Sequence, residues 1–531
     1  MVGVRFLAKE DHLPTRCLVR PGEYHDSVAL MEIARELGRH SSVKDAAVVM
    51  ATDANKDILR QAGLLLPEIE AAAPNDLIIV VQAQTDDAAA HALKMAEVHL
   101  VHRSTMTAPG HVFRPRSIRG VVRTNPGVNL ATISVAGQYA ATEAWQALRN
   151  GLHVLLFSDN VSIEEEIALK QYARNHGLLM MGPDCGTAII NGVALGFANV
   201  VPRGPVGIVA ASGPGLQEVS TLLAKLGVGI AQAIGTGGRD VKQAVGGMMM
   251  LEGLGALQSD PDTQVLVLIS KSPSPVVVEQ ILTQVQMSTK PTVACFLGCD
   301  RASGTATGVI PAHTLQDTAY LAAEQVKGYS GSTASEVIEQ ESATLRTLAI
   351  DMRKSLNPGQ KYLRGLFSGG TLASEAMIIW QDILGDVFSN VPLESRLKLE
   401  DSTQSKGNCA IDLGEDEFTV GLPHPMIDND LRIRRLIREA ADPEVGVLVL
   451  DTVLGHGAHP DPASELAPAI RQAREQAASE DRPLLVVASV TGTQDDPQGL
   501  DRQVQALEDA GAVVCACNAA AARLAAFIIG P

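Results

Sequence analysis

The chain has 531 residues, 46% of them hydrophobic and 19% charged, and its formal net charge is −17. This length predicts several α/β units. The negative charge argues against nucleic acid or an anionic membrane as the main partner. No stretch approaches the ~20 apolar residues of a membrane span. Seven cysteines without CxxC pairs indicate neither a zinc site nor a disulfide framework, so we expect a cytoplasmic protein without a bound metal.

The first unit is predicted over residues 1–125. It alternates predicted strands and helices, at 16–20, 29–40, 45–52, 55–63 and 76–83. Such alternation predicts parallel strands joined by right-handed crossovers. Residues 102–123, with arginines among Ser, Thr, Pro and Gly, are expected to form a loop.

Asn55 and Lys56 follow Thr52 at the start of a predicted helix. Free N–H groups at a helix start can bind an anionic substrate. An ordinary capped helix is the alternative interpretation.

Residues 126–203 repeat the alternation and predict a half-sheet of nucleotide-binding type. Strands are expected at 130–137, 153–158 and 177–187, and helices at 141–151 and from Ser162 onward. Glutamates follow Ser162 directly, which is typical of an N-cap with acidic residues in the first helical turn.

Glycine-rich turns mark residues 204–330, at 207–218, 233–240 and 266–275. The strands before these turns are apolar throughout, as expected for a parallel sheet covered on both faces. Ligands bind at the carboxyl ends of such strands. Where Gly-Pro-Gly opens a helix after Ser212, the free backbone N–H groups predict a phosphate or carboxylate site.

A polar helical linker is predicted at 331–360, because Asn357-Pro358-Gly359 is a strong breaker. The last unit, 361–531, contains a strand–glycine–helix pattern at 366–376 that repeats the pattern at 208–219. An internal duplication explains this repetition. Ser368, Gly369, Gly370 and Thr371 then form a second candidate anion site, with a degenerate copy kept only for folding as the alternative.

Several motifs in order resemble the FdrA family, predicted acyl-CoA synthetases related to succinyl-CoA synthetase. They are LFSDNVSIEEE, MGPDCGTAIINGVAL, GIVAASGPGLQEV, IGTGGRD, ISKSPSP, FSGGTLASEA and GLPHPMID. The resemblance covers almost the whole chain. It implies a Rossmann-like CoA-binding domain at 126–203 and two flavodoxin-like ligase domains at 204–330 and 361–531, with an extra N-terminal α/β domain at 1–125.

For activity, the resemblance implies a subunit of a multi-component carbamoyltransferase that phosphorolyses an oxalurate-like ureido acid to oxamate and carbamoyl phosphate in allantoin breakdown. It also implies companion subunits, small anionic substrates and an oligomer. An acyl-CoA synthetase that uses CoA and a nucleotide is the first alternative. A non-catalytic CoA-binding or scaffold subunit is the second.

The sequence departs from succinyl-CoA synthetase at the residues that carry phosphate in that enzyme. Its Gly-His-Ala-Gly loop corresponds to residues 303–308, which contain no histidine, and its orienting glutamate corresponds to Lys271. Without an imidazole and its carboxylate, the phosphohistidine relay is lost. On this ground we prefer the transferase to the nucleotide-dependent ligase.

The candidate site combines donors and positive charge aimed at an oxyanion. Lys271, Arg239 and His424 are the candidate catalytic residues, and Asp428 joins Asn55 and Lys56 as a candidate for substrate binding. Phosphate binding is assigned to Ser212, Gly213, Gly215, Gly237, Gly238, Ser270, Ser368, Gly369, Gly370 and Thr371. Glycine turns can also serve only close packing, and loop histidines are often without a function.

Overall fold

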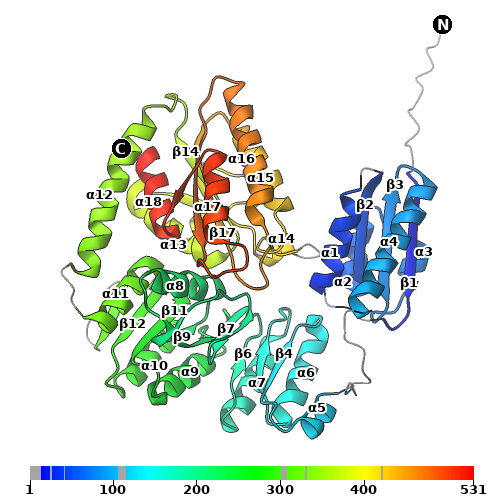
Figure 1. The fold of residues 1–531 in the computed structure, drawn as a ribbon, viewed down its shortest axis with the longest axis horizontal. Coiled ribbons are helices and arrows are strands. Elements are labelled where there is room, and N and C mark those ends of the chain that lie inside the picture. The colour runs from blue at the N-terminus through cyan, green and yellow to red at the C-terminus, as the bar shows by residue number, and fades with distance from the viewer. Residues whose placement is uncertain are drawn as a thin grey trace. The chain divides into compact units, whose positions relative to one another are not determined.

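A computed structural model gives the structure of residues 13–23, 25, 27–40, 42–105, 115, 117–299, 308–328, 332–419 and 423–530. The chain divides into two compact units (Figure 1). The first is formed by the residues up to 115 together with 419–423, and the second by 116–418 and 424–531. No described helix is long and apolar enough to cross a membrane.

The first unit has a three-stranded sheet between two layers of helices. Its elements are β1 (Thr15–Arg20), α1 (Ser27–Gly38), β2 (Val43–Met50), α2 (Asp53–Gln61), α3 (Pro67–Glu70), β3 (Leu77–Ala83) and α4 (Asp86–Thr105). Ile79 and Val81 of β3 pack with α1 and α4, whereas Ile78 and Val80 pack with α2 and α3. Burial of both faces explains why β3 is apolar throughout.

The prediction of a wholly parallel sheet is wrong for this unit. The strand order is β1-β3-β2, and β3 is antiparallel to both neighbours. The crossover through α1 does make β1 and β2 run the same way, but β3 inserts between them, a split arrangement that alternation alone does not reveal. The predicted loop at 102–123 is also partly helical, since α4 ends at Thr105 and α5 spans Ile118–Thr124. Residues 106–114 and 116 lie outside the described residues.

The second unit begins, after α5, with a small parallel sheet. It contains β4 (Leu130–Ile133), α6 (Gly137–Arg149), β5 (His153–Leu156), α7 (Ile163–Asn175) and β6 (Met180–Met181). Ser162 caps α7 through the Glu165 N–H, and the Glu165 side chain returns to the Ser162 backbone. The N-cap predicted at Ser162 is therefore confirmed.

A seven-stranded sheet follows, with the order β13-β12-β11-β9-β10-β7-β8. Its elements are β7 (Thr187–Ile190), β8 (Val193–Gly196), β9 (Arg203–Ala210), α8 (Gly213–Lys225), β10 (Ile230–Gly235), α9 (Met248–Ser259), β11 (Val265–Lys271), α10 (Pro275–Val285), β12 (Thr292–Leu297), β13 (Val309–Ala312) and α11 (Leu315–Lys327). Strands β9 to β13 are parallel. The hairpin β7–β8, inside the predicted 126–203 range, pairs with β10 instead of with the small sheet.

The last sheet is entirely parallel, with the order β15-β16-β14-β17-β18-β19. Its strands are β14 (Tyr362–Phe367), β15 (Val387–Ser389), β16 (Asn408–Asp412), β17 (Val445–Val453), β18 (Leu485–Thr491) and β19 (Ala512–Cys515). Its helices are α13 (Gly370–Leu384), α14 (Asp416–Thr419), α15 (Asp430–Ala440), α16 (Pro462–Ala478), α17 (Leu500–Asp509) and α18 (Asn518–Ile529), with a 3₁₀ turn at Ser395–Leu397.

Helix α12 (Ala334–Arg353), inside the predicted linker, packs against α18. Arg353 Nε donates to the Ile528 carbonyl over 2.8 Å, and the Arg346 guanidinium lies over the Phe527 ring. The helix connects the two large sheets in sequence and is also docked on the last one.

The two large sheets share one hydrophobic core. Helices α8 and α11 of one half and α13 and α18 of the other lie between the sheets, whereas α9 and α10 cover the outer face (Figure 1). Leu216, Leu223, Leu372 and Trp380 are fully buried in this core. The fold class is therefore α/β with two layered ligase-like halves, as predicted.

Two buried glutamates connect the halves reciprocally. Glu218 of α8 accepts the Asn518 N–H at the start of α18 over 2.9 Å, and Glu375 of α13 accepts the Leu315 N–H at the start of α11 over 2.6 Å. Each glutamate stands six residues after the N-cap of its own helix, Ser212 or Gly369. This symmetry supports the internal duplication indicated by the sequence.

Candidate anion site at two helix ends

The N-termini of α8 and α13 meet in the second unit. Ser212 Oγ lies 2.6 Å from Thr371 Oγ1, so the two first turns share a hydrogen bond. The approach is close enough that a side chain at Gly369 would lie 2.7 Å from the Pro214 ring. Of the predicted residues, Ser212, Gly213, Gly215, Gly369, Gly370 and Thr371 lie at this junction.

The α8 end is largely occupied by the protein itself. Ser212 Oγ accepts the Gly215 N–H over 2.9 Å, and Pro214 has no N–H to offer. The Thr187 hydroxyl is buried there without a hydrogen-bond partner, and a side chain at Gly213 would lie 3.1 Å from it. An orphaned buried hydroxyl is costly, so it marks the α8 end as a place where a polar ligand would find an unused partner.

The α13 end receives no side-chain cap. Gly370 is the first residue of α13. The Lys271 Nζ and Asp412 Oδ2 atoms both lie where a side chain at Gly370 would be. Lys271 is the last residue of β11, is 36% exposed, and has its Nζ 3.7 Å from Glu415 Oε1. Uncapped N–H groups beside an ammonium make this helix end the candidate anion site.

Asp412, at the carboxyl end of β16, was not predicted. Burial raises the pKa of its carboxyl to about 7, while Lys271 lowers it. The rule that selected Lys271 would have found it, because it also ends an apolar strand of a parallel sheet. The sequence could not show that β16 and β11 would converge on Gly370.

His424 lies beside this end of the sheet. A side chain at Gly414 would lie 2.8 Å from His424 Nε2 and 3.2 Å from Asp412 Oδ1. Burial, aided by Arg432, lowers the pKa of His424 to about 4, so the ring is neutral. Its Nδ1 accepts the Met426 N–H over 3.2 Å, which assigns the hydrogen to Nε2. A neutral ring that donates from Nε2 suits orientation of a substrate by hydrogen bonding better than the predicted catalytic role.

Arg239 is held by Glu166 and by the backbone of Val161. Its Nη2 lies 2.9 Å from Glu166 Oε2 and donates to the Val161 carbonyl over 2.8 Å. Glu166 in turn belongs to a fully buried network with Lys170 and Asp240. The guanidinium therefore fixes α7 to the β10 turn, which disagrees with the predicted catalytic role.

The β10 turn itself serves close packing. Gly237 has φ +82°, and a side chain there would collide with the Pro183 carbonyl, whereas a side chain at Gly238 would meet open space. Only Gly238 leaves room for a ligand, so at Gly237 the packing alternative holds.

Two predicted serines are also unavailable. Ser270 is fully buried and directs its hydroxyl to the Lys271 carbonyl. Ser368 donates through its N–H, over 2.7 Å, and its hydroxyl to the buried carboxylate of Asp451. Asp451 thus fixes the turn before α13, and the Ser368 side chain does not reach the anion site.

The predicted substrate contacts of the first unit are structural. The Thr52 hydroxyl accepts the Asn55 N–H as an N-cap, and Asn55 Nδ2 donates to the Met50 carbonyl. Lys56 Nζ donates to the carbonyls of Glu70 and Ala72. These contacts support the ordinary capped helix. In the second unit, Asp428 Oδ1 accepts the Asp430 N–H over 2.8 Å at the start of α15.

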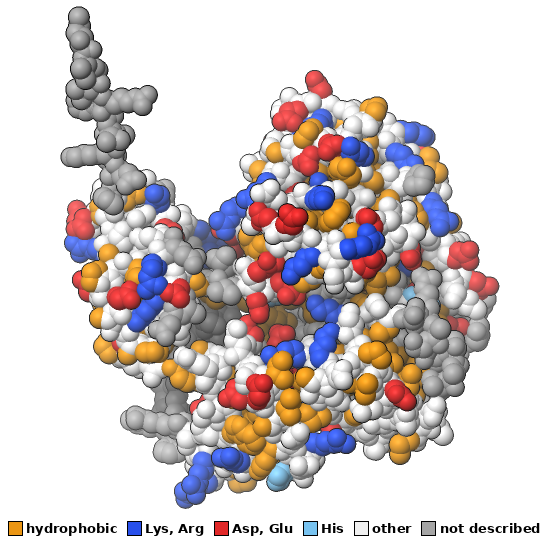
Figure 2. All heavy atoms as spheres, turned by 180° about the vertical axis from the view of Figure 1, so that it is seen from behind, with side chains coloured by type: hydrophobic (Ala, Val, Ile, Leu, Met, Phe, Trp, Pro, Cys, Tyr) orange, Lys and Arg blue, Asp and Glu red, His pale blue; other side chains and the backbone are white. Residues whose placement is uncertain are grey.

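Further carboxylates surround the site. Burial, together with the carboxylates of Asp159 and Asp416, raises the pKa of Asp184 to about 6. Lys271 and Arg239 lower the pKa of Asp184. Figure 2 shows acidic and basic side chains interspersed over the described part of one face, without a broad field of one sign. Selection of an anion therefore depends on local donors.

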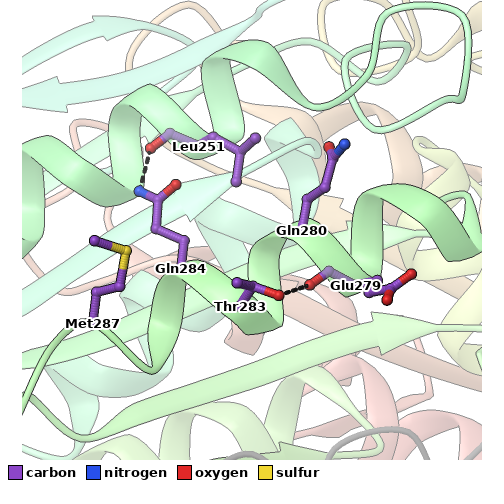
Figure 3. Close-up of a pocket in the computed structure, with 6 residues that line it drawn as sticks. All are labelled: Leu251, Glu279, Gln280, Thr283, Gln284 and Met287. Atoms are coloured by element: carbon purple, nitrogen blue, oxygen red, sulfur yellow. Dashed lines mark hydrogen bonds between the residues drawn. The ribbon is translucent and has the colours of Figure 1, made fainter.

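A shallow pocket of about 390 Å³ lies elsewhere, between α9 and α10 (Figure 3). Gln284 Nε2 donates to the Leu251 carbonyl, and the Thr283 hydroxyl donates to the Glu279 carbonyl. Gln280 and the 83% exposed Met287 complete the lining. These residues are on the outer helical layer and include none of the predicted site residues.

Three family models match the chain. A "CoA-ligase" model matches residues 366–528, a "CoA binding domain" model matches 203–298, and an "AllF, heavy metal-associated domain" model matches 13–112. The CoA-binding match covers β9 to β12, beyond the 126–203 range predicted for that role.

The described residues of the first unit do not fit a heavy-metal site. Cys17 is the one cysteine of residues 1–115, and burial raises the pKa of its thiol, which opposes the thiolate that a metal requires. His25 Nε2 is paired with Glu23 Oε1 over 2.9 Å. No group of three or more His, Cys, Asp or Glu in the described part of the chain could hold a metal ion.

Curated relatives include several CoA ligases. The alpha subunit of succinate–CoA ligase (ADP-forming) from Methanothermobacter thermautotrophicus is 24% identical over 33% of this chain and 60% of its own length. The alpha subunit of malate–CoA ligase from Methylorubrum extorquens is 25% identical over 40% of this chain and 77% of its own. Among solved structures, PH0766 from Pyrococcus horikoshii is 17% identical, with a TM-score of 0.33 over 79% of this chain and 86% of its own.

These matches overturn the predicted carbamoyltransferase activity. The models and the named enzymes are of the CoA-ligase type, so the acyl-CoA synthetase alternative fits better. The error came from treating the missing histidine as a change of reaction.

One relative extends over nearly the whole chain. YahF of Escherichia coli is 43% identical over 510 residues, which are 95% of this chain and 97% of YahF. The chain therefore belongs to the family of YahF and combines an AllF-type N-terminal domain with CoA-binding and CoA-ligase domains.

Proposed function

We propose that the chain is the acyl-transferring component of an acid–thiol ligase of the FdrA type. The reaction is acyl phosphate + CoA-SH → acyl-CoA + phosphate, or its reverse. The observation that carries the proposal is the meeting of the α8 and α13 N-termini beside Lys271. The uncapped α13 end, an ammonium and the unused Thr187 hydroxyl suit the phosphate dianion that leaves in this reaction.

The roles of individual residues follow from their contacts. Lys271 and the uncapped N–H groups of α13 bind the phosphate, and Thr187 adds its unused hydroxyl from the α8 side. His424 orients the substrate as a neutral donor. The 303–308 segment contains no histidine and lies mostly outside the described residues, so no phosphohistidine step is included.

A route for the CoA arm is supported by aromatic rings. The Phe157 ring, just after β5, lies 5.4 Å from the Phe197 ring, which lies 6.2 Å from His424. Helix α6 begins without a side-chain cap at the carboxyl edge of the same small sheet. That helix end would receive the diphosphate of CoA, with the rings lining the way to the anion site.

We propose that companion subunits form and activate the acyl group. The related succinate–CoA and malate–CoA ligases are named as alpha subunits, which fits such a division of work. The cytoplasm is the expected compartment.

The test is arsenolysis, in which arsenate replaces phosphate and the acyl arsenate hydrolyses. The purified chain is incubated with arsenate and single acyl-CoA thioesters, including succinyl-CoA and malyl-CoA. We expect release of free CoA thiol with at least one small thioester, dependent on arsenate and inhibited by phosphate. A chain that releases no thiol above the rate without protein is not an acyl transferase, and the scaffold interpretation then replaces it.

A further inference from the structure

The carboxylate of Asp412 is fixed against the anion site. Its Oδ1 accepts the Gly414 N–H over 2.9 Å, and its Oδ2 lies at Gly370 beside Lys271 Nζ. The side chain is 2% exposed. An anion bound at the first turn of α13 would contact Oδ2 directly, because Gly370 has no side chain to separate them.

The main chain of Asp412 is equally restrained. Asn390 Oδ1 accepts its N–H and Asn390 Nδ2 donates to its carbonyl, both over 2.9 Å. A group fixed on both sides suits proton transfer, where geometry must be kept during the reaction.

The groups that face Asp412 come from separate elements. Lys271 belongs to β11, Glu415 follows β16, and His424 lies in the loop before α15. Burial and Glu415 raise the pKa of the carboxyl, while Lys271 and the Gly414 N–H lower it. The result is a carboxyl that can exchange a proton near neutral pH, which an exposed aspartate cannot do.

We propose that Asp412 carries the proton between the CoA thiol and the phosphate. This inference rests on the proposed acyl transfer. As the thiol sulfur bonds to the acyl carbon, the Asp412 carboxylate accepts the thiol proton. The bond from that carbon to the phosphate oxygen breaks with its electron pair, and Asp412 then donates the proton to that oxygen. Acyl phosphate dianion and thiol become thioester and HPO₄²⁻, so atoms and charge balance.

The competing explanation is a structural partnership in which Asp412 only neutralises Lys271. The two explanations differ for Asp412→Asn, which keeps the shape and loses the titrating proton. If Asp412 is a proton carrier, Asp412→Asn should still bind phosphate as the wild type does. If Asp412 is only a structural partner, the substitution should disturb Lys271 and therefore weaken phosphate binding.

The experiment measures arsenolysis and phosphate binding for wild type, Asp412→Asn and the control Asp430→Asn. The control removes a charge from the exposed start of α15. We expect Asp412→Asn to lose at least about 100-fold in rate, with the Kd for inorganic phosphate within about threefold of wild type. The arsenolysis rate of the control and its Kd for phosphate should both stay within about threefold of the wild-type values.

The pH profile gives a second measurement. In the arsenolysis direction Asp412 must first accept the arsenate proton, so the wild-type rate should rise with pH and reach half of its plateau near pH 7. The ratio of the wild-type rate to the Asp412→Asn rate should rise in the same way, because the ionisation of arsenate itself affects both proteins equally. Full activity of Asp412→Asn, or loss of phosphate binding together with rate, overturns the inference. Failure of the wild type in arsenolysis would instead overturn the proposed function.

Discussion

The N-termini of α8 and α13 descend from the same strand–turn–helix pattern and differ in what surrounds their first turn. At α8, Ser212 caps the helix and Pro214 removes a donor, whereas α13 has no cap and receives Lys271 and Asp412. Deeper in both helices the copies remain alike, since Glu218 and Glu375 make equivalent contacts. The two copies of the pattern therefore share their packing residues and differ at the positions of the proposed anion site.

The largest expected effect comes from Lys271, whose side chain distinguishes the α13 end. Lys271→Ala should lower the arsenolysis rate by about 100-fold or more, because one positioned charge is removed from the developing phosphate. Arg239→Ala should lower it less than about threefold, because that guanidinium is held by Glu166. Initial rates at saturating thioester check both values.

Lys242→Ala is the matched control for this comparison. Lys242 is near Lys271, but its Nζ donates to the Ser272 carbonyl over 2.8 Å. The arsenolysis rate of Lys242→Ala should be close to that of the wild type. Equal losses for the three variants would show that general charge, not the position at Gly370, controls the reaction.

The next effect concerns the equivalent glutamates. Glu218→Ala and Glu375→Ala should each lower the free energy of unfolding by about 2–4 kcal/mol, because buried donors at a helix start lose their acceptor. Chemical denaturation followed by circular dichroism measures both. Asn518 contacts both carboxylates, so the double variant should deviate from additivity. A large loss at one position and none at the other would contradict the reciprocal arrangement.

A smaller effect separates the two helix ends directly. A side chain at Gly370 would collide with Lys271 and Asp412, whereas one at Gly213 would meet the Thr187 hydroxyl at 3.1 Å. Gly370→Ala should therefore weaken phosphate binding about tenfold, which corresponds to about 1.4 kcal/mol. Gly213→Ala should change the affinity for phosphate only about twofold. Calorimetric titration with inorganic phosphate measures both, and a reversed order would place the main anion contact at α8.

The sequence predicted the strand–turn–helix units because apolar strands and glycine turns are local signals. Those signals were enough to locate Ser212, Gly370 and Lys271 at the carboxyl edges of strands. They could not show which of these donors already form hydrogen bonds or ion pairs within the protein. Arg239 and Ser368 looked available, but their partners, Glu166 and Asp451, lie far away in sequence.

The antiparallel placement of β3 was beyond prediction for the same reason. Pairing order depends on contacts between strands that are distant along the chain, and the apolar run of β3 would suit either direction. Asp412 was missed because only the folded sheets bring it to Lys271.

The last expected effect is a pH dependence of stability that arises from Glu375. Burial raises the pKa of Glu375 to about 7, with Glu218 adding to the shift. In the unfolded chain a glutamate ionises near pH 4.3. Between these values the folded protein holds a proton that the unfolded chain releases, so this group's contribution to the free energy of unfolding falls as pH rises. For one group the slope is at most about 1.4 kcal/mol per pH unit.

Glu375→Gln should remove that contribution, so the variant gains stability relative to wild type from pH 5 to pH 7. Denaturation at several pH values measures the difference, with Glu339→Gln on exposed α12 correcting for the loss of one charge. A difference that stays constant with pH would mean that Glu375 is already ionised in the folded protein and stabilises the helix starts as a carboxylate.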